Sequence, residues 1–121
     1  MAESIICTSA FEFGCRILKL GERFWDRGPA ARHVARQLMG CGTSIGANAE
    51  ESQEAQTKAD FIAKLSVSRK EARETRYWLR MSVRTEVATA TEVEWELREV
   101  NELRAMIIAA IKTARGSSSR G

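Results

Sequence analysis

The chain has 121 residues, a net charge of +3, 44% hydrophobic residues and 29% charged residues, which suits one ordinary globular domain rather than a disordered tail. No apolar run approaches the roughly 20 residues of a membrane span, and no secretory signal begins the chain, so we expect a cytoplasmic protein. The three cysteines show neither a CxxC motif nor metal-ligand spacing, which favours reduced thiols over disulfides or a metal site.

The first predicted helix runs from about residue 4 to residue 25. Its apolar face consists of residues at helical spacing, namely Phe13, Ile17, Leu20 and Phe24. The sequence Arg27-Gly28-Pro29 then breaks the helix, and Pro29 is well placed as the first residue of a second one.

The second predicted helix runs from about Pro29 to near Ser52 and contains Gly40, Gly42 and Gly46. Glycine propensity alone favours a loop here. The apolar spacing nevertheless continues straight through the glycines, at Val34, Leu38, Cys41 and Ile45. We therefore expect a helix whose small residues let another helix approach closely.

The third predicted helix follows a capping box at residues 57 to 60 and ends near Thr85. One apolar stripe faces the core and consists of Phe61, Leu65, Ala72 and Leu79. A second stripe lies nearly opposite and consists of Val67, Trp78 and Met81. Because both stripes must be buried, the second predicts an oligomer interface with another chain.

The fourth predicted helix begins near residues 91 to 94. Its apolar face consists of Val93, Leu97, Val100, Leu103, Ile107 and Ala110. Residues 116–121 are rich in Gly and Ser and predict a disordered C-terminal tail, which leaves residues 1–115 as the bundle domain. Four helices with short connections predict an all-α fold, a single antiparallel up-and-down four-helix bundle.

Few residues offer catalytic or metal chemistry. The single histidine, His33, cannot build a multi-histidine metal site. Glu50, Glu51 and Glu54 cluster at the end of the second helix and would suit a divalent cation. The Glu-x-x-His motifs of di-metal bundles are absent, however. We predict no catalytic, cofactor-binding or metal-binding residue and no small-molecule substrate, with a metal enzyme at these glutamates as a third alternative.

The most informative feature is a basic row on the third helix, since residues 61–85 carry seven Lys or Arg against two Asp or Glu. Five arginines fall within an arc of about 80°, with Lys70 and Tyr77 beside them, and these are Arg69, Arg73, Arg76, Arg80 and Arg84. Guanidinium groups suit contacts with nucleic-acid phosphates that do not read the bases. The alternative is a solvated face neutralised by nearby acids, with candidates Glu71, Glu74, Glu92, Glu94, Glu96, Glu99 and Glu102.

Three segments carry a resemblance to a known family. They are Thr43-Ser44-Ile45-Gly46-Ala47-Asn48-Ala49-Glu50, Lys58-Ala59-Asp60-Phe61 and Lys70-Glu71-Ala72-Arg73-Glu74-Thr75. Their order and spacing resemble the four-helix-bundle proteins first found as reading frames in intervening sequences of bacterial 23S ribosomal RNA genes. The similarity spans about Phe11 to Thr113. Where many relatives have Gly, this chain has Glu51, so we expect the second helix to continue further here.

The resemblance implies a left-handed bundle that assembles into a ring-like homopentamer and has no established enzymatic activity. Related bundle proteins are accessory factors of diversity-generating retroelements, in which a basic pentamer engages a reverse transcriptase and nucleic acid. We therefore expect a non-enzymatic oligomer that binds RNA or DNA through Arg69, Lys70, Arg73, Arg76, Arg80 and Arg84. The alternative is a protein–protein scaffold or accessory subunit, in which the basic row makes subunit contacts.

Overall fold

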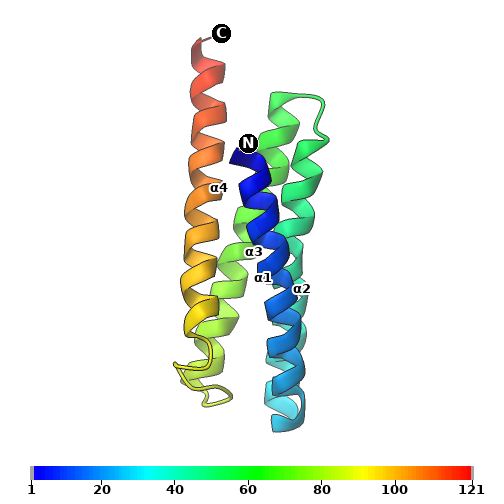
Figure 1. Ribbon diagram of the computed structural model, residues 1–121, viewed down its shortest axis with the longest axis vertical. Coiled ribbons are helices and arrows are strands. Elements are labelled where there is room, and N and C mark those ends of the chain that lie inside the picture. The colour runs from blue at the N-terminus through cyan, green and yellow to red at the C-terminus, as the bar shows by residue number, and fades with distance from the viewer. Residues whose placement is uncertain (1, 121) are drawn as a thin grey trace.

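Four long helices run alternately up and down in the computed structural model, which describes the backbone of residues 2–120 and the side chains of residues 5–116 (Figure 1). The elements are α1 (Ala2–Phe24), the 3₁₀ turn η1 (Trp25–Arg27), α2 (Pro29–Gln53), α3 (Lys58–Arg84) and α4 (Glu94–Arg120). No strand occurs in this part of the chain. The predicted all-α four-helix bundle is confirmed.

Helix α4 passes the predicted domain boundary at residue 115 and is assigned as far as Arg120. The side chains of residues 117–120, and residue 121 as a whole, lie outside the described part of the chain. The predicted disordered tail at residues 116–121 therefore stays a prediction. No helix within the described residues combines the length and apolar character needed to cross a membrane.

Apolar side chains at three- and four-residue spacing from all four helices form the core. The predicted face of α1 is fully buried, namely Phe13, Ile17, Leu20 and Phe24. The predicted face of α2 is likewise buried, namely Val34, Leu38, Cys41 and Ile45. On α3, Leu65, Ala72 and Leu79 are buried and Phe61 is half-buried. On α4, the predicted core residue Leu97 is only half-buried, whereas its neighbour Glu96 is buried.

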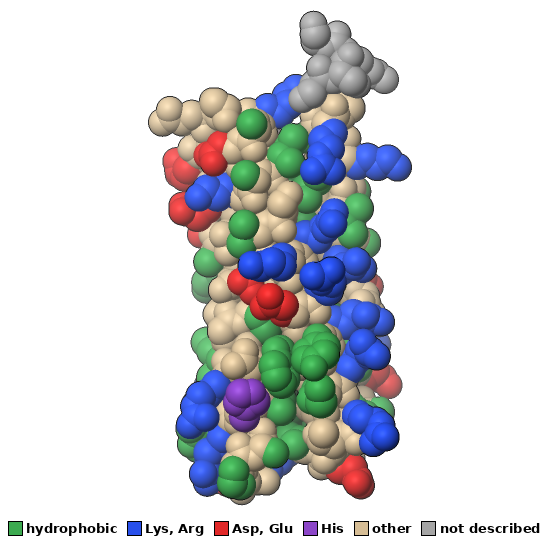
Figure 2. All heavy atoms as spheres, turned by 180° about the vertical axis from the view of Figure 1, so that it is seen from behind, with side chains coloured by type: hydrophobic (Ala, Val, Ile, Leu, Met, Phe, Trp, Pro, Cys, Tyr) green, Lys and Arg blue, Asp and Glu red, His purple; other side chains and the backbone are tan. Residues whose placement is uncertain are grey.

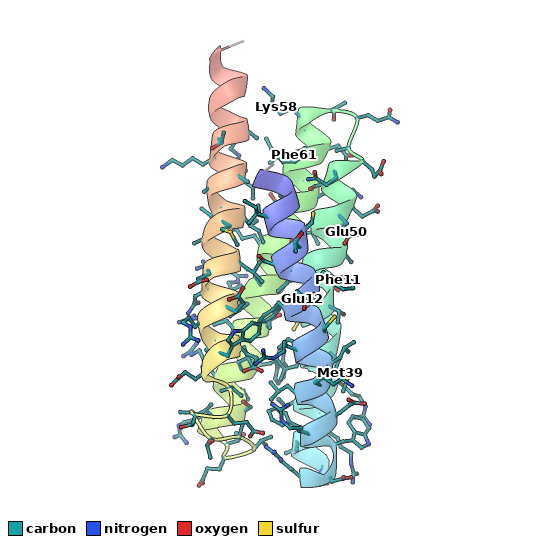
Figure 3. All side chains as sticks on the ribbon, viewed as in Figure 1. Phe11, Glu12, Met39, Glu50, Lys58 and Phe61 are labelled. Carbon is teal, nitrogen blue, oxygen red and sulfur yellow. The ribbon has the colours of Figure 1, made fainter. Side chains whose placement is uncertain are left out.

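The contact between α1 and α2 explains why α2 contains glycines, and α2 continues through them as predicted. A Cβ atom at Gly42 would lie 2.7 Å from Cγ2 of the buried Ile17 on α1, which is too close for a real contact. On the same interface, Met39 of α2 lies against Gly21 of α1 (Figure 3). The small residues thus let the two backbones approach closely.

The connections between helices follow local sequence signals. Gly28, with φ of +114°, joins η1 to α2, and Pro29 is the first residue of α2. Thr57 caps α3 as predicted, because its hydroxyl accepts a hydrogen bond of 3.0 Å from the N–H of Asp60. Residues 85–93 connect α3 to α4, and Glu92 in this connection accepts two hydrogen bonds from Arg27, of 2.7 and 2.8 Å.

Candidate nucleic-acid interface

The basic row predicted on α3 lies on the flank of this helix that borders α4. All of its members are exposed, namely Arg69, Lys70, Arg73, Arg76, Arg80 and Arg84. Figure 2 shows Lys and Arg side chains gathered in a column along one side of this face. The helical spacing of the row therefore produces a continuous basic strip along much of the bundle.

None of these six cations forms an ion pair with an acidic side chain among the described residues. The ion pairs found there are Lys19–Glu22, Arg23–Glu92, Arg27–Glu92 and Arg98–Glu94. Glu71 is half-buried, and this burial, followed by the negative charge of Glu74, raises its pKa above the ordinary value. The positive charge of Lys70 in the row acts in the opposite sense and lowers the pKa of Glu71. Nearby acids were one predicted source of neutralisation for the row, but no ion pair within this part of the chain provides it.

Aromatic side chains occupy the flank of α3 that borders α2. The Trp78 ring meets His33 of α2 edge to face, with centroids 5.4 Å apart, and meets Tyr77 at 5.1 Å. Trp78 is half-buried against the core, so it is already packed within the chain. Val67 is 38% exposed and Met81 is half-buried. The oligomer interface predicted at Val67, Trp78 and Met81 stays a prediction.

Tyr77 lies where the basic row meets these aromatic rings. Its side chain is 50% exposed. It borders a shallow hollow of about 360 Å³ together with Glu74 and three arginines of the row, Arg73, Arg76 and Arg80. An exposed ring among guanidinium groups offers a surface on which an unpaired base can stack beside its phosphates.

A second basic feature joins α3 to α4. A cleft of about 210 Å³ lies between the two helices, and its lining is Ser66, Arg69, Lys70, Arg73, Arg104 and Arg115. Arg104 and Arg115 were not predicted from the sequence, because no motif on α4 connects them to the row. Their separation of eleven residues, which is close to three helical turns, puts both on one line of α4, and a helical wheel would have shown this.

Comparison with known proteins identifies the family of the chain. The family model described as 23S rRNA-intervening sequence protein matches residues 2–109. The chain belongs to this family. It is also similar to a crystal structure of a protein with unknown function from the S23 ribosomal protein family of Bacteroides thetaiotaomicron. The two chains are 35% identical with a TM-score of 0.86, over 93% of this chain and 99% of that one. No curated protein matches the chain.

The second helix of this family member ends at Gln53. Glu51 lies inside α2, and the predicted end of this helix near Ser52 is confirmed. The expectation that the helix continues further here than in relatives stays a prediction. The family resemblance stated from the sequence is confirmed. Neither the family description nor the similar crystal structure's description names an enzymatic reaction.

The acidic cluster of this family member lies at the far end of α2. Glu50, labelled in Figure 3, and its neighbours Glu51 and Glu54 are all exposed. Among the described residues, no group of three or more His, Cys, Asp or Glu side chains is arranged to hold a metal ion. His33 contacts Trp78, as described above. Cys41 is buried, and this burial raises the pKa of its thiol, which lowers its thiolate fraction and hence its reactivity.

Proposed function

We propose that this family member is a non-enzymatic nucleic-acid-binding bundle that contacts RNA phosphates through the basic row of α3. The row consists of Arg69, Lys70, Arg73, Arg76, Arg80 and Arg84. Guanidinium groups form paired hydrogen bonds to phosphate oxygens, and such contacts hold a nucleic acid without reading its sequence. RNA is the first ligand to test.

One observation carries this proposal: the six cations are exposed and none has an acidic partner within the described residues. A cation that is already paired must give up its partner before it contacts a phosphate, and that exchange gains little. Within the described residues, the cations of the row have no ion-pair partner to give up. Their positions along one flank of α3 also match the extended, regularly charged backbone of a nucleic acid.

The proposal is tested by filter binding of a structured RNA across a salt titration. Each phosphate contact contributes about 0.7 to 0.9 to the slope of log affinity against log salt. Changing Arg73, Arg76 and Arg80 together to Ala should therefore lower this slope by about two to three and weaken binding at every RNA sequence.

A matched control removes the same charge elsewhere. Lys19, Arg32 and Arg98 are exposed and lie outside the row, so their joint replacement by Ala lowers the net charge equally. This control should keep most of the affinity of the unmodified protein. An absence of RNA binding at low salt, or an equal loss in both triple variants, would remove the proposal.

A second candidate is a protein–protein scaffold or accessory subunit within a homo-oligomer, the pentamer that the family resemblance implies. Exposed glutamates at the end of α2, Glu50, Glu51 and Glu54, favour it, because they could pair with the basic row of an adjacent copy. Under this candidate, the Arg73, Arg76 and Arg80 variant dissociates the oligomer in light scattering. An unchanged molar mass would exclude this role for the row.

A further inference from the structure

The cleft between α3 and α4 concentrates positive charge beyond what the row alone supplies. Its lining comes from Ser66, Arg69, Lys70 and Arg73 on α3 and from Arg104 and Arg115 on α4. Five of these six residues are cationic, the sixth carries a hydroxyl, and none is acidic. No ion pair within the described residues involves any of them.

Arg104 lines this cleft and carries a donor without a partner. Its side chain is half-buried, and its Nε atom is buried without a hydrogen-bond partner. A buried N–H group without an acceptor is unfavourable, and more so when the group is charged. Solvent does not reach this atom in the present arrangement, so an anion in the cleft becomes its acceptor when the guanidinium group of Arg104 turns toward the cleft.

The arrangement of the cations favours a phosphoryl group over a carboxylate. Donors reach the cleft from two helices, and the arginines of α3 and α4 lie on opposite walls. A carboxylate presents two oxygens in one plane and suits one guanidinium fork. A phosphoryl group presents several oxygens in different directions, so it can accept hydrogen bonds from both walls at once.

The repulsion among the cations of the cleft also favours a phosphoryl group as the occupant. Like charges around one small hollow repel one another, and the repulsion is larger where solvent is partly excluded. A bound dianion reverses the sign of these interactions, because each cation then faces an opposite charge. A bound phosphoryl group is therefore expected to stabilise the packing of α4 against α3.

We propose that the α3–α4 cleft is a phosphate-binding site, in which Arg104 and Arg115 of α4 and Arg69, Lys70 and Arg73 of α3 hold one phosphoryl group. The inference deepens the proposed function and rests on it for the case in which the phosphate belongs to a nucleic acid. The site itself would take free phosphate equally, since the recognised chemistry is the same.

Thermal unfolding with inorganic phosphate tests the site directly. The melting temperature of the unmodified protein should rise by about 3 to 5 °C in phosphate relative to sodium chloride at equal ionic strength. Phosphate also stabilises proteins without binding to them, but that effect is common to all variants. The result that counts is the difference between variants, namely a smaller rise in Arg104→Gln and Arg115→Ala than in the unmodified protein.

Arg84→Ala is the matched control, because Arg84 belongs to the row but not to the cleft. It should keep the full rise in melting temperature. Arg115 is exposed, so its variant remains informative if Arg104→Gln impairs folding. An equal rise in the unmodified protein and in the Arg104, Arg115 and Arg84 variants would overturn the proposal.

RNA filter binding on the same variants separates the two sources of phosphate and the two proposals. A loss of RNA affinity in Arg115→Ala, alongside the smaller phosphate effect, identifies a nucleic-acid phosphate as an occupant. Unchanged RNA affinity with a smaller phosphate effect identifies free phosphate. If Arg76→Ala with Arg80→Ala leaves RNA binding unchanged while phosphate still acts through Arg115, the proposed function fails and the site stands.

Discussion

Gly42→Ala tests whether the glycines of α2 serve helix–helix contact. An added Cβ would lie 2.7 Å from Cγ2 and 3.0 Å from Cγ1 of Ile17. Ile17 is fully buried and β-branched, so one χ1 rotamer is strongly preferred and the side chain cannot easily turn aside. At Gly40, two residues earlier in the same helix, nothing lies within 4 Å of an added Cβ.

Two effects of opposite sign decide the outcome. Alanine favours the helix over glycine by about 1 kcal/mol at either position. The clash with Ile17 adds an overpacking penalty of about 1 to 3 kcal/mol at Gly42 alone. Gly40→Ala should therefore raise the free energy of unfolding by about 1 kcal/mol, whereas Gly42→Ala should leave it unchanged or lower it by up to about 2 kcal/mol.

Urea unfolding followed by circular dichroism measures both variants. The gain in helix propensity is the same in Gly40→Ala and Gly42→Ala. The difference of about 2 kcal/mol between their free energies of unfolding therefore measures the clash with Ile17. Gly21→Ala gives an intermediate case, since its Cβ would lie 2.6 Å from Cε and 2.8 Å from Cγ of Met39, an unbranched side chain that can change its rotamer. The reasoning is refuted if Gly42→Ala proves as stable as Gly40→Ala.

Three further predictions concern polar and aromatic side chains. Glu96 is 2% exposed and its Oε1 has no hydrogen-bond partner, so Glu96→Met should stabilise by about 1 to 3 kcal/mol in urea unfolding, and a loss of stability would contradict this. The hydrogen bond from Arg27 lowers the pKa of Glu92 below its ordinary value of 4.5. The stabilisation that this pair gives the folded state is therefore fully present above pH 4.5 and is lost as the pH falls through the lowered pKa. Arg27→Ala should accordingly lower the free energy of unfolding by about 1 kcal/mol at pH 7. The difference from the unmodified protein should narrow below about pH 4.5, and a difference that stays constant with pH would contradict the prediction. Tyr77→Leu should weaken single-stranded RNA about tenfold in competition binding but leave duplex RNA unchanged, and equal losses would exclude base stacking.

The helices were predictable because their signals are local. The buried face of α1 recurs at helical spacing, from Phe13 to Phe24, and the structure buries it completely. Thr57 and Asp60 lie three residues apart, so the signal for the start of α3 lies within one helical turn of the sequence. Even the glycines of α2 were interpreted correctly, because the apolar spacing on either side of them outweighed their low helix propensity.

The candidate site was only half predictable, because part of it depends on contacts between helices. The row on α3 follows from one helical wheel, whereas Arg104 and Arg115 join it only through the packing of α4. Glu96 was misjudged for a different reason. It lies midway between the buried Val93 and Val100, which marks a core position, but we treated it as a surface acid because carboxylates are rarely buried.

Three of the acids that the sequence offered to the row are engaged elsewhere. Glu92 binds Arg23 and Arg27, and Glu94 pairs with Arg98 at 3.9 Å. Glu96 lies in the core. Glu71 and Glu74 stay beside the row, since the charge of Lys70 lowers the pKa of Glu71 and Glu74 borders a hollow with three arginines of the row. The fold thus separates charges that the sequence places close together, and a net charge of +3 understates the field along α3. None of the six cations of the row has an ion-pair partner within the described residues, and the two proposed functions differ in whether a nucleic acid or another subunit supplies one.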